Sequence, residues 1–285
     1  MEPLPRLQAR IASLGELRDL VGALRGLSGV HLQEAQETLT GIRNYVDIVG
    51  TAIAEAAALL PETTDRTDEI AEFPGDAADG VLIVVCSEHG FTGAFNEHLF
   101  DRAAAERRPD QKIAVIGRRG TILADERNID IEWTFAMATH AGGVLNVTRR
   151  VAEQIADARA VDIVFASYRK GGAYEIEAKR ILPLDPALLD RAAGRSPPLH
   201  HMPAELLLVR LASEYLFAEI THAVMESLAS ENAARLQVME AADRNIGDKL
   251  EQFHRTEHTV RQETITAELL ELVTGSEAVL GNGNW

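Results

Sequence analysis

The chain has 285 residues, of which 46% are hydrophobic, 25% charged and only 5% aromatic, so it is long and apolar enough to bury one or two cores. Its 44 acidic residues outnumber its 28 basic ones. The resulting net charge of −16 argues against a nucleic-acid-binding protein, whose affinity comes largely from Lys and Arg on phosphates. The single cysteine, Cys86, excludes an internal disulfide, and the absence of an 18-residue apolar run predicts no membrane span. Because the first ten residues lack the layout of a secretory signal or a transit peptide, we expect a soluble cytoplasmic chain.

The ten prolines divide the chain into three segments, because none lies between residues 6 and 60 and none follows Pro203. Proline breaks a helix, so two long proline-free flanks predict two long helices around a middle domain. We therefore predict an N-terminal coiled-coil helix over residues 1–60, a central α/β domain with connectors over 61–203, and a C-terminal coiled-coil helix over 204–285.

The N-terminal flank repeats apolar or small residues at alternating steps of three and four, which is the a/d pattern of a left-handed coiled coil. At about 1.5 Å per residue, a helix of roughly 55 residues would be about 80 Å long, so it must protrude or pair with another helix. The members of this predicted seam are Leu32, Ala35, Leu39, Ile42, Val46, Val49, Ile53, Ala56 and Leu60.

Glycines interrupt this predicted helix, and each costs about 1 kcal/mol relative to alanine. One interpretation is that they let a partner backbone approach closely, and the other is that they make the helix torsionally soft. We favour the close approach. The glycines concerned are Gly15, Gly22, Gly26, Gly29, Gly41 and Gly50.

The middle segment alternates strand-like and helix-like stretches, which predicts a small α/β layer domain with a mostly parallel five-stranded sheet. The Gly-Gly pair between the last two strands suits a tight reversal, so we expect the final strand to be antiparallel. Residues 62–79 and 180–203 are interpreted as connectors. The predicted strands are Val81–Cys86, Lys112–Ile116, Ile129–Trp133, Val161–Tyr168 and Tyr174–Leu182, and the predicted helices lie near Ala94–Ala105, Arg118–Glu126 and Val144–Ala158.

The last flank again carries apolar residues at helical spacing, from Leu216 to Leu272. A helix from each end, similar in length, can meet the other only if the chain reverses between them. We therefore predict an antiparallel two-helix coiled coil with both termini near one tip.

Two features could carry chemistry, and in both the structural interpretation is favoured. Residues 87–96 (SEHGFTGAFN) follow a strand and open a helix, where a phosphate-binding turn would sit, but they lack the full G-x-G-x-x-G spacing and a Lys-Ser/Thr pair. His254 and His258 have metal-ligand spacing on one helix face, but no HExxH context or third ligand nearby, which favours a solvated or interhelical pair.

In residues 261–272 (RQETITAELLEL), charges and amides cover most of the helix outside one apolar stripe. This pattern is typical of the solvated back of a coiled coil. It also suits a face that binds another protein through amide and carboxylate hydrogen bonds, and the residues alone leave both interpretations open.

Three separated motifs converge on one family. Arg10-Ile11 with Ser13 and Ala23-Leu24, then SEHGFTGAFN, then ASENAAR at 229–235 through RQETITAELLELVTGSEAV at 261–279 together resemble the gamma subunit of F-type ATP synthases. The last motif is the most specific, and the resemblance covers nearly the whole chain in the right order. It implies an α/β fold in which an antiparallel coiled coil accompanies a Rossmann-like domain.

The resemblance implies a rotor that performs no covalent chemistry and needs no cofactor or metal of its own. In the family the coiled coil stands inside a ring of alpha and beta subunits, and the foot sits on the membrane-embedded c-ring with the epsilon subunit. This places the chain at the cytoplasmic face of a bacterial inner membrane, peripheral through the complex. On matched positions, the beta contacts would be Arg261, Gln262, Thr266 and Glu268, and Leu24 stands at the family's helix-one methionine.

The chain departs from the family in its N-terminal helix, where a Lys-rich KITKAM stretch is replaced by residues 18–24 (RDLVGAL), and in His89-Gly90-Phe91, which replaces Arg-Gly-Leu. This divergence favours a second-copy bacterial enzyme such as an N-type ATPase, and the translocated ion, proton or sodium, stays open because selectivity belongs to the c-ring. Two other functions remain open at this point: a nucleotide-binding enzyme on the central domain with helical dimerisation arms, and a helical adaptor that does not rotate.

Overall fold

The computed structural model describes residues 3–59, 80–189 and 199–281. By its internal contacts the chain divides into two compact units, one made of Met1–Gly26 with Met239–Trp285 and the other of Leu27–Val238. The three predicted segments are divided by position along the sequence, whereas these two units are divided by contacts. The segments therefore stay a prediction. Among the described residues, no helix combines the length and the apolar character needed to cross a bilayer.

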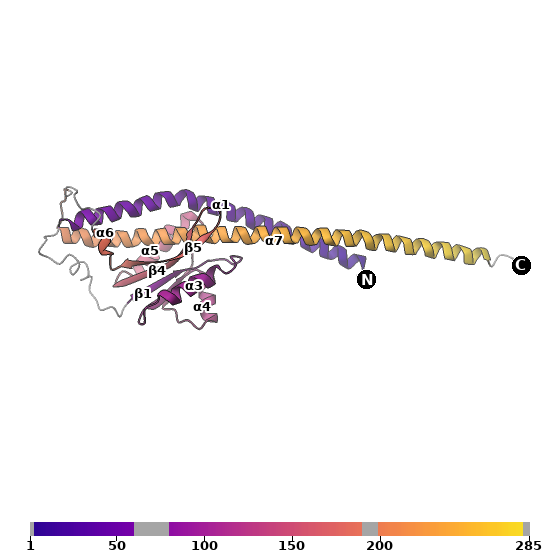
Figure 1. Ribbon diagram of the computed structural model, residues 1–285, viewed down its shortest axis with the longest axis horizontal. Coiled ribbons are helices and arrows are strands. Elements are labelled where there is room, and N and C mark those ends of the chain that lie inside the picture. The colour runs from indigo at the N-terminus through magenta and orange to yellow at the C-terminus, as the bar shows by residue number, and fades with distance from the viewer. Residues whose placement is uncertain (1–2, 60–79, 190–198, 282–285) are drawn as a thin grey trace. The chain divides into compact units, whose positions relative to one another are not determined.

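Helix α1 spans Leu4–Ala57, so the long N-terminal helix is confirmed (Figure 1). Its predicted seam is the buried face of the helix in the second unit, while Leu60 lies outside the described residues. Leu32, Ile42 and Val46 are partly buried against the same core. The fully buried members are Ala35, Leu39, Val49, Ile53 and Ala56.

Helix α7 spans Ala204–Gly281 and runs antiparallel to α1 in each unit, as predicted. In the first unit Gln8 of α1 donates to Glu257 of α7, while Arg18, further along α1, donates to Asp243, earlier in α7. In the second unit, Arg43 donates to Glu226. Ion pairs and amide contacts therefore accompany the apolar seam on both units.

The predicted apolar seam of α7 is wrong beyond Val260. Ile265, Leu269 and Leu272 are between 49% and 70% exposed. The reason is that α1 begins at Leu4 and Gln8 already pairs with Glu257, so α1 has few residues left to cover the last turns of α7.

The sheet has the order β3-β2-β1-β4-β5. Strands β3, β2, β1 and β4 are parallel to one another, and β5 pairs antiparallel with β4, as predicted. Gly171 and Gly172 both have positive φ in the reversal that joins β4 to β5, a conformation that glycine adopts readily. The strand bounds are β1 Gly80–Val85, β2 Lys112–Ile116, β3 Trp133–Phe135, β4 Ala160–Tyr168 and β5 Tyr174–Leu182.

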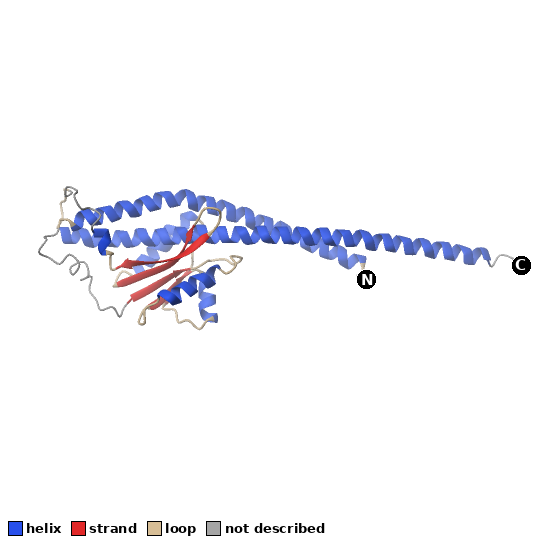
Figure 2. Ribbon diagram, in the orientation of Figure 1, coloured by secondary structure: helices blue, strands red, loops and turns tan. Residues whose placement is uncertain are grey.

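Helices cover both faces of this sheet, which is why every residue of β1 is buried (Figure 2). Leu82 and Val84 face the core that contains α3 (Phe95–Glu106) and α4 (Arg118–Glu126). The alternate residues of β1 face the second core, which is formed with α5, α1 and α7. Short elements complete the layer: η2 Ala141–Gly143, α5 Val144–Gln154 and α6 Pro186–Leu189.

Two elements of the middle segment differ from the prediction by more than one residue. The third strand is Trp133–Phe135 and not Ile129–Trp133, because Ile129 and Ile131 pack against the core from the connection between α4 and β3. Helix α5 ends at Gln154, since Ile155 leaves the helical conformation. Of the two predicted connectors, residues 62–79 lie outside the described residues, and the second contains the end of β5 and α6.

The favoured explanation for the glycines of α1 is wrong at five of the six positions, and at the buried Gly50 it stays a prediction. A Cβ atom built on Gly15, Gly22, Gly26, Gly29 or Gly41 would meet no atom within 4 Å. No backbone approaches these glycines closely in the described chain, so their cost to the helix is not offset by packing there.

Replacing Gly22 by alanine should therefore raise the free energy of unfolding of the isolated chain by about 0.5–1 kcal/mol, because alanine is the better helix former and has open space at this site. Urea unfolding followed by circular dichroism measures the change. Gly120→Ala is the matched control and should destabilise, since its Cβ would lie 2.4 Å from the Cβ of Cys86. A loss of stability in Gly22→Ala would contradict the open environment of that face.

Candidate functional site

The four predicted contact residues of α7 lie on its exposed end. Every residue from 261 to 273 is exposed. Arg261 donates to Glu257 one turn back at 2.8 Å, and the Thr266 hydroxyl donates to the carbonyl of Gln262 at 2.8 Å. The side chains of Gln262 and Glu268 are open to solvent. A regular helix with exposed amides, carboxylates and leucines is available here for another protein.

The structure does not bring Leu24 close to these four residues. Leu24 is half-buried on α1, and Arg18 and Arg25 on either side of it both donate to Asp243 of α7. Asp243 precedes Arg261 by 18 residues, which is about 27 Å along a helix. Leu24 and the α7 end are therefore two separate candidate contacts on the first unit.

Glu257 joins α1 to α7 just before the exposed end. It accepts hydrogen bonds from Gln8 of α1 at 3.0 Å and from Arg261 at 2.8 Å, and the His254 ring lies 3.5 Å from its other oxygen. The pKa of Glu257 is lowered, first by the hydrogen bond from Gln8 and then by the hydrogen bond from His254 and the positive charge of Arg261. Within the described part of the chain, no group of three His, Cys, Asp or Glu side chains could hold a metal ion, so His254 and His258 gain no third ligand there.

The loop after β1 is bound by a buried ion pair on α7. The amides of Glu88 and His89 both donate to the Glu231 carboxylate at 3.4 Å. Arg235 pairs with Glu231 and donates to the carbonyls of His89 and Gly90 at 3.3 and 3.1 Å. Burial raises the pKa of Glu231, and Arg235 with the two amides opposes that rise. The loop and the 229–235 segment, which are far apart in sequence, thus form one cluster.

A second carboxylate fills the adjoining end of the sheet. Glu88 is buried and accepts the amide of Arg118, at the start of α4, at 3.1 Å. It also accepts the amide of Met137, after β3, at 2.9 Å. These amides stand at the carboxyl ends of parallel strands, where phosphates bind in folds of this class. In this chain the carboxylates of Glu88 and Glu231 accept the hydrogen bonds of these backbone amides.

Sequence reasoning missed a buried hub on α7. Glu226 is 1% exposed and accepts from Arg43 of α1 at 3.1 Å and from the amide of Tyr168, at the end of β4, at 2.9 Å. The His222 ring lies 3.3 Å from the same carboxylate. Burial favours a higher pKa for Glu226, but the hydrogen bonds from His222, Arg43 and Tyr168 outweigh it and lower the pKa. The available signal was the presence of acids among the apolar residues of a long helix.

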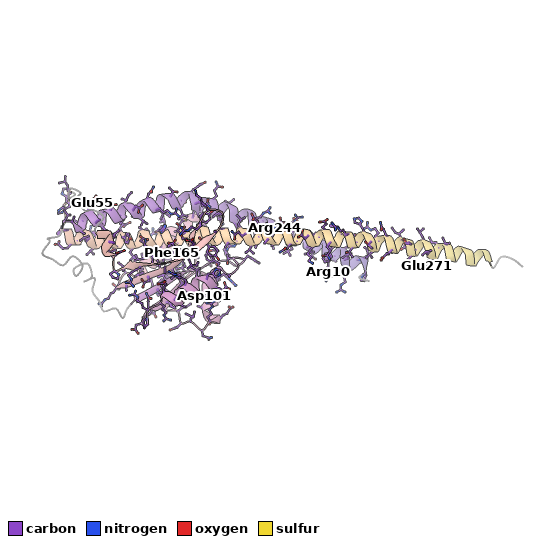
Figure 3. The ribbon with its side chains drawn as sticks, in the orientation of Figure 1. Arg10, Glu55, Asp101, Phe165, Arg244 and Glu271 are labelled. Atoms are coloured by element: carbon purple, nitrogen blue, oxygen red, sulfur yellow. The ribbon has the colours of Figure 1, made fainter. Side chains whose placement is uncertain are left out.

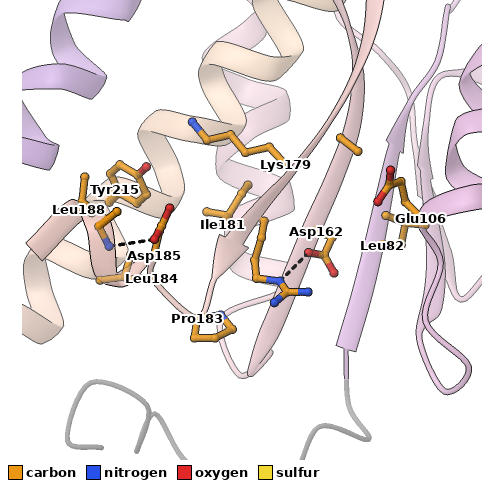
Figure 4. Close-up of a pocket in the computed structure, with 13 residues that line it drawn as sticks. Leu82, Glu106, Asp162, Lys179, Ile181, Pro183, Leu184, Asp185, Leu188 and Tyr215 are labelled. Carbon is orange, nitrogen blue, oxygen red and sulfur yellow. Dashed lines mark hydrogen bonds and ion pairs between the residues drawn. The ribbon is translucent and has the colours of Figure 1, made fainter. Parts of the chain in front are cut away.

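A cavity of about 640 Å³ lies at the end of β5 beside α6 and Tyr215 of α7 (Figure 4). Three of its charged lining residues, Asp162, Lys179 and Arg180, form ion pairs within the chain. Arg180 and Gln111 donate to Asp162 at 3.2 and 2.6 Å, and Lys179 pairs with Glu219 at 2.7 Å. The cavity is at the opposite end of the parallel strands from the Glu88 and Glu231 carboxylates.

A family model described as ATP synthase matches residues 4–279. The ATP synthase gamma chain of Geobacter sp. strain M21 is 25% identical over 99% of this chain and 100% of its own length. That of Anaeromyxobacter sp. strain Fw109-5 is 27% identical over 98% of this chain and all of its own. The chain belongs to the gamma-subunit family of F-type ATP synthases.

Solved structures show the gamma-family fold over most of the chain. A chain of the Euglena gracilis mitochondrial ATP synthase rotor aligns with a TM-score of 0.58 at 14% identity, over 92% of this chain and 98% of that one. A chain of the Tetrahymena thermophila mitochondrial central stalk and c-ring aligns with a TM-score of 0.55 at 16% identity, over 78% and 99%.

Glu226→Gln should lower the free energy of unfolding by about 2 kcal/mol at neutral pH, because a neutral amide cannot balance the charge of the Arg43 guanidinium. The lowered pKa means that the carboxylate's contribution is complete above its ordinary value of 4.5 and is lost as the pH falls below it. The difference between wild type and variant should therefore shrink on acidification. Urea titrations between pH 3 and 7 measure it.

Glu175→Gln is the matched control, since this exposed carboxylate pairs with Arg169 on the surface and should contribute well under about 1 kcal/mol. Equal effects of the two substitutions, or a Glu226 difference that grows below pH 4.5, would contradict the buried hub.

Proposed function

We propose that this chain is the central rotor stalk of a bacterial F-type ATP synthase or ATPase and couples c-ring rotation to the catalytic beta subunits. Family membership supports this role. The single observation that carries it is the end of α7, where residues 261–273 are all exposed on a helix whose preceding turns are joined to α1. A stalk needs such a surface to contact a surrounding ring.

The proposed partners are the alpha and beta subunits, which would surround the helices, together with the epsilon subunit and the c-ring. The similar solved structures, an ATP synthase rotor and a central stalk with a c-ring, support the c-ring as a partner. The chain would then be peripheral to the cytoplasmic face of the inner membrane, held there through the complex.

The stalk would act by differential contact and would catalyse no covalent step. Its surface is not symmetric: one side of α7 carries Arg261 and Glu268, which are seven residues apart, and another carries Gln262 and Thr266. Each orientation would present different groups to each catalytic subunit. A contact that differs between states of a subunit shifts the population of those states, and hence their affinity for nucleotide.

The proposed contact residues are Arg261, Gln262, Thr266 and Glu268 on α7 and Leu24 on α1. Exposed amides and carboxylates on a fixed helix can form directional hydrogen bonds, and Leu24 offers a half-buried apolar contact further along the stalk. The transported ion, proton or sodium, would be selected by the c-ring. The reduced positive charge of residues 18–24 supports the N-type subgroup.

A nucleotide-binding enzyme on the α/β layer is the first alternative. The backbone amides that would bind a phosphate already donate to the carboxylates of Glu88 and Glu231. A phosphate would have to displace these carboxylates, which disfavours the nucleotide-binding enzyme. Titration of the isolated chain with ATP and with NAD should show no tight binding. Tight binding of either would favour the enzyme.

A helical adaptor without rotation is the second alternative. Purification of the native complex separates the two proposals. A stalk should co-purify with three alpha and three beta subunits per copy, as its family does, whereas a scaffold would have another composition.

Glu268→Gln and Gln262→Ala should each lower the ion-coupled ATPase activity of the assembled complex severalfold while leaving the fold intact, because each removes an exposed hydrogen-bonding group from the proposed contact. ATP-driven ion pumping in vesicles, normalised to assembled complex, measures the effect. Glu263→Gln, also exposed on α7 but outside the proposed set, is the matched control and should keep full activity. Unchanged coupling in both variants would contradict the assignment of Gln262 and Glu268 as partner contacts.

A further inference from the structure

The cavity of about 640 Å³ at the end of the edge strand β5 is lined from both sides of the sheet. Leu82 and Ala178 pack in the core that contains α3, whereas Ile181 and Leu188 pack in the core that contains α7. These two sides are the α3 face and the α7 face of the cavity. On the α7 face the apolar lining residues are buried, and they are Ile181, Leu184, Leu188 and Tyr215.

On the α3 face, the acids that line the cavity already have cationic partners. Asp162 pairs with Arg180 at 3.2 Å and also with Arg108. Glu106, the last residue of α3, pairs with Arg102 at 2.9 Å. A carboxylate that is neutralised in this way attracts a further cation only weakly. The α3 face therefore does not select a cation.

On the α7 face, one carboxylate of the described chain keeps an uncompensated charge. Lys179 is neutralised there by the buried Glu219 at 2.7 Å. The Asp185 carboxylate accepts the backbone amide of Ala187 at 2.9 Å, and no Lys, Arg or His among the described residues forms an ion pair with it. Figure 4 shows Asp185 on the same side of the cavity as Tyr215. The α7 face thus combines a single negative charge with apolar surface.

We propose that the cavity binds a small organic ammonium ion, with its charge against Asp185 and its apolar group between Ile181 and Leu188. The negative charge selects a cation, and the Tyr215 ring can attract an ammonium group through its electron-rich face. A calcium ion needs roughly six to eight oxygen ligands, and nowhere in the described ranges do three His, Cys, Asp or Glu side chains gather to hold a metal. Because all the lining residues belong to this chain, binding needs no other subunit.

Titration of the full chain with n-hexylammonium chloride tests the site, with binding followed by the NMR signals of labelled Ile and Leu methyl groups. An alkylammonium ion is charged at neutral pH, as lysine is. It should shift the methyl signals of Ile181, Leu184 and Leu188 in a saturable way. It should also bind about fivefold more tightly than neutral 1-hexanol, since the two ligands bury the same alkyl chain and differ in charge. No saturable shift at these methyl groups, or equal binding of the ammonium and the alcohol, would overturn the proposal.

Asp185→Asn isolates the charge. The amide oxygen of the new side chain can still accept the hydrogen bond from Ala187, so α6 should keep its start. The preference for the ammonium over the alcohol should fall to about one, because the variant has no charge to offer. Asp101→Asn is the matched control: it makes the same change at an exposed acid of α3, labelled in Figure 3, that does not line the cavity, and it should keep the preference.

A preference that survives Asp185→Asn, or that both substitutions abolish, would contradict Asp185 as the binding group. A second measurement uses the wild-type chain alone. Its preference for the ammonium should decrease as the salt concentration rises, because salt screens an exposed charge. A preference that is independent of salt would also contradict a site based on charge.

Discussion

Three buried carboxylates on α7 hold the α/β layer against the long helix. Glu219 pairs with Lys179 of β5, Glu226 with Arg43 of α1 and the Tyr168 amide, and Glu231 with amides of the loop after β1. A buried charge without partners is costly, so these groups favour the one packing that satisfies all of them. The apolar cores supply most of the burial, and the carboxylates fix where β4, β5 and the loop meet the helix.

The same interactions explain how a fold typical of nucleotide-binding proteins can serve as a structural part. Parallel strands leave amides at their carboxyl ends, and in many proteins these bind phosphate. In this chain Glu231 and Glu88 accept those hydrogen bonds, so the site becomes a joint between the sheet, α4 and α7. The function then depends on exposed surfaces and on rigid attachment, since fold alone does not determine activity.

Periodicity was enough to predict both long helices, their antiparallel pairing and the sheet with its final reversed strand. It failed where local pattern and tertiary packing conflict, as in the Ile129–Ile131 stretch, whose alternation marks residues packed from a loop. Periodicity also could not show that the apolar repeat of α7 continues beyond the N-terminal start of α1, where no residue of α1 is left to cover it. The links of Glu226 and Glu231 to distant amides lie between segments far apart in sequence, and no spacing rule reveals them. The contact residues came from motif resemblance and not from geometry.

Rotation of the α/β layer relative to the alpha–beta ring is the most direct test of the stalk. A bead attached through a cysteine at the exposed Asp101 of α3, in a complex immobilised by its beta subunits, would report the motion of the layer. ATP should drive the bead in one direction in discrete steps. A bead that stays fixed while the complex hydrolyses ATP would contradict the rotor.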